Sequence, residues 1–301
     1  MRTRQQWFSL VAKGFAMGSA DLVPGVSGGT IAFITGIYNE LIATIAALGP
    51  NTVRDVFSIG IVETWRKYNC GFLLALVSGI ALAVLVLSNT IHHFQVEHPE
   101  ELRSFFAGLV IASTPIIYRS ISKKSTGNFA WCVLGVALAL LITSLPPAVQ
   151  SNSPLFIAFS GAIAISAMLL PGISGSFILV ILGAYSPVIA SIAGFDLMVV
   201  GAFLIGIIGG LLAFSRILKR VLENHRDKTL SVLVGFMIGA LQVLWPWREN
   251  VRELYTHSDG RIEWMTAKVL PTGDFYEVAF IVIWAILGAV VVTALDKLSN
   301  R

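Results

Sequence analysis

Two short interruptions, Pro24-Gly-Val-Ser-Gly28 and Pro171-Gly-Ile-Ser-Gly175, lie within strongly apolar stretches of the chain. Proline removes a backbone donor and glycine permits conformations that other residues resist, so each interruption breaks a helix and leaves backbone groups unpaired. Inside a membrane, such groups are tolerated only where they are buried in protein or line a polar cavity. The helix after each break then offers N–H groups and hydroxyls to an anion, most naturally phosphate.

The candidate phosphate-binding residues are the glycines and hydroxyls of the two interruptions: Gly25, Ser27, Gly28, Gly29, Thr30, Gly172, Ser174, Gly175 and Ser176. The plain structural alternative is that Pro and Gly kink packed helices while Ser27 or Ser174 caps the helix that follows.

Two acidic residues beside the first interruption are candidates for coupling or gating. An acid beside an apolar break is costly unless it is protonated or paired, and acids within membranes often mark ion pathways. Asp21 fits this description, and Met168 occupies the matching place in the second copy. The structural alternatives for Asp21 are a cap of the turn and a pair with Lys13. Glu40 is the second candidate, and its alternative is a polar end of the hairpin.

Three basic residues, Lys13, Arg119 and Arg216, lie at or near the expected cytoplasmic ends of apolar segments. They could draw a phosphate group inward. Anchors that extend their charged ends to the membrane surface explain each of them equally well.

The stretch from Ala20 to Tyr38 recurs from Ala167 to Tyr185, with ten of nineteen positions identical. Unrelated apolar helices would share Leu, Ile and Ala, but they would not place Pro, Gly, Ser and Tyr in the same register. The chain is therefore an internal duplication. Paired Gly/Pro-interrupted segments at matching places in two halves are typical of transporters that bind substrate between broken helices.

Composition indicates a polytopic membrane protein, because 13% of the 301 residues are charged and 55% are hydrophobic. We expect an all-α fold of two inverted repeats, each a broken re-entrant helical hairpin plus three transmembrane helices of about twenty residues. Repeat 1 (1–150) has its hairpin at 7–47 and helices at 71–91, 104–119 and 129–149. Repeat 2 (151–301) has its hairpin at 154–193 and helices at 197–215, 229–247 and 276–296.

Basic residues set the expected orientation. The Lys- and Arg-rich loops should face the cytoplasm: 1–13, 50–70, 119–128 and 216–228. The loops with one basic residue or none should face outward: 92–103, 146–154 and 191–196. These sets alternate only if each hairpin enters and leaves on one side, which inverts the repeats and places both chain ends in the cytoplasm. Segment 248–275 must lie outside despite four basic residues, and we expect an interfacial cap there.

The sequence lacks the motifs that would indicate an enzyme or an ATP-driven pump. The sequence has no phosphate-binding loop ending in Gly-Lys-Ser/Thr and no His-Glu-x-x-His metal motif, and its basic residues do not follow one face as in nucleic-acid-binding proteins. We expect no catalytic residue, metal or cofactor and no nucleic-acid partner. Transport would follow a gradient or be coupled to a proton or sodium ion. The alternatives are a carrier of small inorganic anions and a non-transporting scaffold of envelope assembly.

The chain resembles the bacterial family DUF368 over essentially its whole length. The resemblance rests on Asp21-Leu-Val-Pro-Gly-Val-Ser-Gly-Gly-Thr30, Gly36-Ile-Tyr38, Gly108-Leu-Val, Leu170-Pro-Gly-Ile-Ser-Gly-Ser176, Gly235-Phe-Met and Trp245-Pro-Trp247. Members of that family are implicated as polyprenyl-phosphate transporters. The resemblance implies a flippase that returns undecaprenyl phosphate from the outer to the inner leaflet of the bacterial inner membrane, where cell-wall assembly reuses it. It also implies that positions 21–30 and 171–176 serve this transport.

Overall fold

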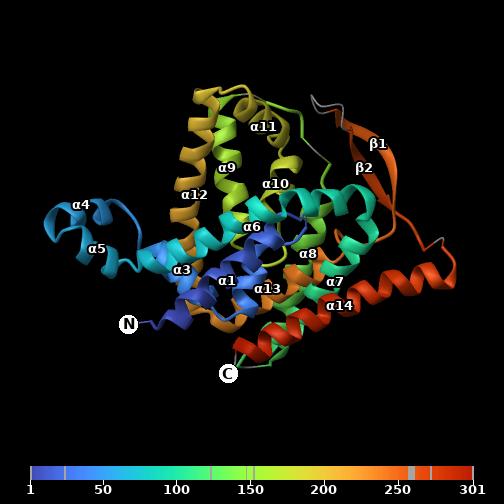
Figure 1. The fold of residues 1–301 in the computed structure, drawn as a ribbon, viewed down its shortest axis with the longest axis horizontal. Coiled ribbons are helices and arrows are strands. Elements are labelled where there is room, and N and C mark those ends of the chain that lie inside the picture. The colour runs from blue at the N-terminus through green and yellow to red at the C-terminus, as the bar shows by residue number, and fades with distance from the viewer. Residues whose placement is uncertain are drawn as a thin grey trace.

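The structure is a computed structural model. It describes residues 2–23, 25–122, 124–146, 148–151, 153–256, 262–271 and 273–299, without the side chains of 250, 252–256, 262–265, 298 and 299. The described residues form fourteen helices and a two-stranded sheet (Figure 1). The first half contains α1 (Arg4–Asp21), α2 (Gly28–Ile34), α3 (Tyr38–Ala47), α4 (Pro50–Ser58), α5 (Ile61–Lys67), α6 (Cys70–Glu97), α7 (Pro99–Arg119) and α8 (Thr126–Ser144). The second contains α9 (Pro154–Met168), α10 (Gly175–Ile181), α11 (Tyr185–Ala193), α12 (Leu197–Asn224), α13 (Arg226–Ala240), β1 (Arg248–Thr256), β2 (Ile262–Lys268) and α14 (Phe275–Ser299).

Within the described part of the chain, four helices, α6, α8, α12 and α14, are long and apolar enough to cross a membrane. Two further apolar elements are bent helix pairs, with angles of 118° between α2 and α3 and 106° between α10 and α11. Counting each bent pair as one span gives up to six spans. The expected class, a helical polytopic membrane protein with a broken hairpin in each half, is confirmed.

Two predicted helices end earlier than expected. Helix α8 ends at Ser144 instead of 149 because Leu145 precedes Pro146, and a residue before proline is disfavoured in helical geometry. Leu145 is extended, with ψ of 133°. Helix α13 ends at Ala240 instead of 247 because the chain turns after Ala240. The Arg248 guanidinium stabilises this turn by donating to the carbonyls of Gln242 and Val243, each at 2.9 Å.

The segment expected to form an interfacial cap contains the sheet. Strands β1 and β2 are antiparallel, with Arg248 opposite Lys268. The sequence analysis did not predict these strands, although β-forming residues flank a Ser258-Asp-Gly260 turn signal. The structure does not describe residues 257–261 of this segment.

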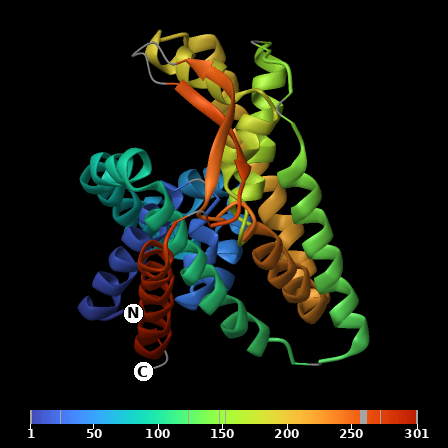
Figure 2. The same cartoon turned by 90° about the vertical axis from the view of Figure 1, so that its right-hand side faces the viewer.

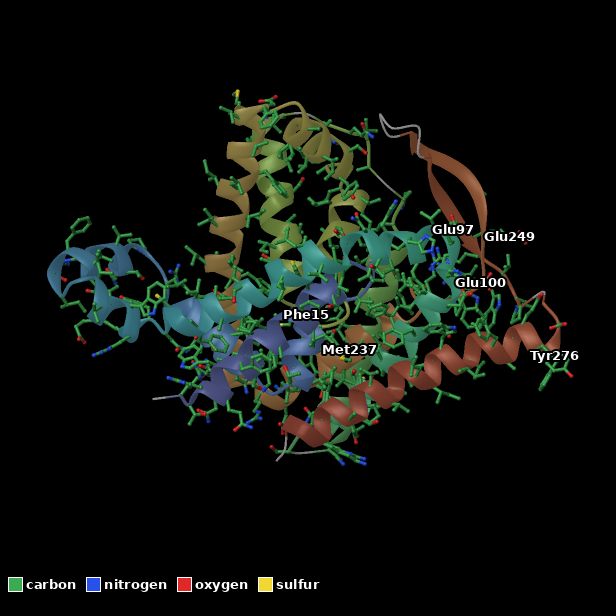
Figure 3. The ribbon with its side chains drawn as sticks, viewed as in Figure 1. Phe15, Glu97, Glu100, Met237, Glu249 and Tyr276 are labelled. Carbon is green, nitrogen blue, oxygen red and sulfur yellow. The ribbon has the colours of Figure 1, made fainter. Side chains whose placement is uncertain are left out.

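Charged side chains gather where the sheet begins. Figure 3 shows Glu97, Glu100 and Glu249 in the region where α6 ends, α7 starts and β1 starts. Among them, the Arg103 guanidinium donates to the Pro246 carbonyl at 3.3 Å. Burial lowers the pKa of Arg248 to about 10, and the nearby positive charge of Arg103 acts in the same direction. Both arginines therefore donate hydrogen bonds to backbone carbonyls of the turn that follows α13.

Four tightly packed helix pairs form most of the molecule: α1 with α6, α9 with α12, α7 with α14, and α8 with α13. Figure 2 shows the last pair side by side. The first two pairs repeat the same contact, because a Cβ at Gly79 would overlap the Val11 carbonyl and one at Gly206 would overlap the Ala158 carbonyl. The other two pairs each join helices from different halves, so the final helices of the repeats are exchanged.

Helices α4 and α5 project from the side of the molecule (Figure 1). Their apolar side chains, including Phe57 and Ile61, are largely exposed. Hydrogen bonds from Lys67 and Tyr68 hold the pKa of Asp55 below its usual range and join α4 to the end of α5. The predicted cytoplasmic loop 50–70 is therefore an ordered helical unit with an apolar surface.

Substitution of Gly206 by alanine should destabilise the protein, whereas the same change at Gly209 should not. A Cβ at Gly206 overlaps the backbone of Ala158, while nothing lies within 4 Å of a Cβ at Gly209 on the same helix. Overpacking costs about 1–3 kcal/mol, and alanine at an open helical site gains about 1 kcal/mol in helix propensity. Thermal unfolding of both variants in detergent measures the difference. Equal midpoints would contradict the close contact of α9 and α12.

Candidate functional site

The two helix breaks have the same backbone geometry. Gly25 has φ of +88° and Gly172 has φ of +89°, in the left-handed region that favours glycine. Pro24 lies outside the described residues. A Cβ on Gly172 would come within 3.0 Å of the Met237 Cα, so both conformation and space restrict this position to glycine.

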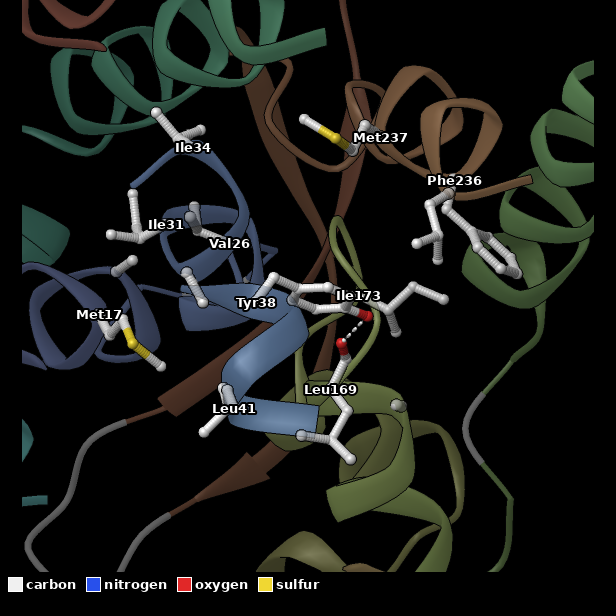
Figure 4. Packing of buried hydrophobic residues seen from close by; sticks show 14 of the residues in the cluster. Met17, Val26, Ile31, Ile34, Tyr38, Leu41, Leu169, Ile173, Phe236 and Met237 are labelled. Carbon is white, nitrogen blue, oxygen red and sulfur yellow. Dashed lines mark hydrogen bonds between the residues drawn. The ribbon is translucent and has the colours of Figure 1, made fainter. Parts of the chain in front are cut away.

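The two breaks meet in the centre of the molecule. Three hydrogen bonds join them: Ser27 Oγ donates to the Met168 carbonyl at 2.9 Å, Tyr38 OH donates to the Leu169 carbonyl at 2.8 Å, and the Gly172 N–H donates to Thr30 Oγ1 at 3.2 Å. Figure 4 shows the bond from Tyr38 to Leu169 among packed apolar side chains. Unpaired backbone groups are costly away from water. The side chains of the first break therefore satisfy the backbone of the second.

The N-terminus of α2 is occupied by groups of its own hairpin. The Gly28 N–H donates to Asp21 Oδ1 at 2.7 Å, and the Gly29 N–H donates to Ser27 Oγ at 3.1 Å. Asp21 therefore holds the position that the sequence analysis assigned to phosphate. An external anion at this helix end would have to replace the carboxylate.

The second break presents its polar groups differently. Ser174 precedes α10, and among the described residues its side chain makes no capping bond to that helix. Instead, the hydroxyls of Ser174 and Ser176 are hydrogen bonded to each other at 2.8 Å. Met168 offers no charge in place of Asp21. The predicted serines thus form a pair of hydroxyls beside a helix end that has no carboxylate.

Residues 25–29 also match the letters Gly-x-Ser-x-Gly, the pattern around the nucleophile of many hydrolases. In those enzymes the serine is exposed at a sharp turn. Here Ser27 is fully buried and its hydroxyl is bound to the Met168 carbonyl. This geometry is that of a structural serine.

Two of the three predicted cations bind carbonyls at helix ends. Lys13 Nζ donates to the Thr35 carbonyl after α2 at 2.7 Å. Arg216 donates to the Ala46 carbonyl at 3.3 Å and also to the Leu48 carbonyl, both at the end of α3. Positive charge at a helix C-terminus is stabilising. Arg119 is exposed in the last turn of α7, so the structure does not bring the three cations into one site.

Glu40 joins three parts of the first half. Its Oε1 accepts hydrogen bonds from Arg2 before α1 and from Asn69 before α6, the latter at 2.7 Å. It therefore holds the start of α3 in place. The sequence did not indicate Asn69 as its partner, because nothing in the local pattern connects the two residues.

Replacement of Tyr38 by phenylalanine should destabilise the protein. It leaves the Leu169 carbonyl buried without its donor, which costs about 1–3 kcal/mol. Tyr118→Phe is the matched control, since Tyr118 is exposed and its ring would keep the contact with Lys124 Nζ at 5.2 Å. Thermal unfolding in detergent compares the two variants. Equal shifts would show that the bond between the breaks contributes little.

Comparisons with known proteins agree over most of the chain. A family model described as undecaprenyl phosphate translocase-like matches residues 17–262. A polyprenyl-phosphate transporter of Vibrio cholerae serotype O1 is 42% identical over 245 residues, which are 81% of this chain and 80% of the relative. A polyprenyl-phosphate transporter of Staphylococcus aureus is 33% identical over 261 residues, which are 80% of this chain and 87% of the relative. No solved structure matches the chain. The chain belongs to the undecaprenyl phosphate translocase-like family.

Proposed function

We propose that the protein carries polyprenyl phosphate, and specifically undecaprenyl phosphate, from the outer to the inner leaflet of a bacterial inner membrane. The observation that carries the proposal is the direct contact between the two breaks, in a chain whose relatives are named polyprenyl-phosphate transporters. It is a transporter and not an enzyme, with both termini in the cytoplasm. The proposal needs no cofactor.

The substrate has one phosphate on a long apolar tail, so its carrier needs a polar interior and an apolar exterior. Hydroxyls and N–H groups of the two breaks supply the interior. Helices α2 and α10 have seven residues each, so these local groups contribute more than the helix dipoles do. In this proposal phosphate enters near Ser174 and Ser176 and leaves toward Lys13, Arg119 and Arg216.

The unequal bonding of the two breaks supports a mechanism of alternating access. In this structure Ser27 and Tyr38 donate to the second break. The matching residues, Ser174 and Tyr185, would donate to the first break in the inverted arrangement. Exchange between the two arrangements opens the path first to one side and then to the other.

Asp21 is the proposed coupling residue. Its carboxylate binds the Gly28 N–H, where the phosphate would also bind. Neutralisation by a proton, or pairing with a sodium ion, would weaken this internal bond and let the phosphate replace it. Glu40, bound to Arg2 and Asn69, would gate the movement of α3.

Transport should depend on the serine pair of the second break. Replacing both Ser174 and Ser176 by alanine removes two donors to a charged group, which should slow leaflet translocation of a fluorescent polyprenyl phosphate in proteoliposomes by about tenfold to a hundredfold. Ser144→Ala at the end of α8 is the control.

The same assay separates the alternative functions. A scaffold would show no translocation by correctly inserted wild-type protein. A carrier of small anions would be inhibited by water-soluble phosphates and would not move the lipid.

Asp21→Asn should preserve the fold and remove the response of transport to a pH gradient. The amide oxygen of asparagine can still accept from Gly28, but the side chain no longer titrates. Translocation rates at two imposed pH gradients, for wild type and variant, give the comparison. An unchanged gradient response in the variant would exclude Asp21 as the coupling residue.

A further inference from the structure

A cavity of about 400 Å³ lies between the first hairpin and the second half of the chain. We call it the α3–α12 pocket. Its lining includes Phe33 and Asn39 from the first hairpin, and Lys219, Glu223 and Arg226 from the region where α12 meets α13. The sequence pattern did not single out these residues as a binding site. Segment 216–228, predicted as a loop, is rich in basic residues and forms the end of α12 and the start of α13.

The charged lining of the pocket is positive. Lys219 Nζ and Glu223 Oε1 lie 3.8 Å apart on one face of α12, so the charges of these two side chains largely cancel. Arg226, at the start of α13, adds a positive charge that can form two hydrogen bonds to a phosphate. Asn39 adds an amide donor from α3. This set suits an anion with several acceptor oxygens.

The rest of the lining is apolar and includes Phe33, Ile42 and Leu222. A volume of about 400 Å³ is within the usual range for ligand pockets, roughly 300–1,000 Å³. It exceeds the needs of a free phosphate and leaves room for the first units of a hydrocarbon chain. The pocket therefore combines cationic and amide groups with apolar walls. This combination matches a lipid whose head group is a phosphate monoester.

We propose that the α3–α12 pocket binds the phosphate monoester end of a lipid. This inference rests on the proposed function and adds a second binding site for the lipid phosphate, away from the two breaks. The pocket lies between α3 and α12, so a movement of α3 against α12 would change its shape. Arg216, one turn before Lys219, holds the end of α3 to α12. Movement of α3 would therefore couple release of the lipid to rearrangement of the first hairpin.

Photo-crosslinking of the full chain in phosphatidylcholine nanodiscs tests this assignment. The probe is a polyprenyl phosphate with a photoreactive group near the phosphate, and the same compound without phosphate is the control ligand. Labelled peptides from residues 219–230 are expected with the phosphate probe, and labelling should fall at least about tenfold in Lys219→Gln/Arg226→Gln. Arg220→Gln/Lys228→Gln removes the same charge from residues that do not line the pocket and should label like wild type.

Further arms keep the outcomes distinct. Competition by unlabelled polyprenyl phosphate or phosphatidic acid, but not by inorganic phosphate, assigns the ligand to a lipid; equal competition by inorganic phosphate overturns that. Equal labelling by the neutral compound overturns the phosphate site.

Ala43→Leu, which fills the pocket without changing charge, should also reduce labelling if the double variant does not fold. Translocation by wild type without labelling of 219–230 overturns the pocket alone, whereas labelling without translocation supports the pocket and overturns the proposed function.

Discussion

The fold depends on the hydrogen bonds by which side chains of one interrupted helix satisfy the backbone of the other. A break within an apolar helix leaves N–H and C=O groups that lipid cannot pair. In this chain the hydroxyls of Ser27 and Tyr38 bind the carbonyls of Met168 and Leu169, while Thr30 accepts from Gly172. These bonds join residues from opposite halves, so side chains of the first break satisfy the backbone of the second. The N–H groups of Gly28 and Gly29 in the first break bind side chains of their own hairpin. The glycine-based helix pairs around them hold the two breaks at contact distance.

The duplicated halves share a backbone but differ in charge. Lys13 and Asp21 in the first hairpin correspond to Ser160 and Met168 in the second. Lys13 binds the Thr35 carbonyl, whereas Ser160 Oγ is buried without a hydrogen-bond partner among the described residues. Both ionisable groups therefore belong to the first hairpin. The backbones of the two hairpins are close to symmetric, but their charges are not. The two hairpins would therefore interact differently with an anion.

The sequence predicted those features that residue type controls locally. Pro and Gly in matching registers indicated both breaks, and the apolar runs indicated the helices. Contacts between distant segments were not predictable in this way. A cap of the turn was one of the roles open to Asp21, and its bond to Gly28 agrees with that role, whereas the alternative pair with Lys13 does not form in the described part of the chain. Nothing near Arg216 indicated that it would cap α3. The α3–α12 pocket joins Asn39 to Arg226, which only the folded chain brings together.

The bonding of the second break by side chains of the first has a consequence for biosynthesis. Chains emerge from the ribosome N-terminus first, at roughly 5–20 residues per second. The hydroxyls of Ser27 and Tyr38 are therefore made many seconds before the carbonyls of Met168 and Leu169 that they bind. During that interval the first hairpin cannot settle in lipid with its final pairing. The contact between the two breaks is therefore completed only after the second half has been made.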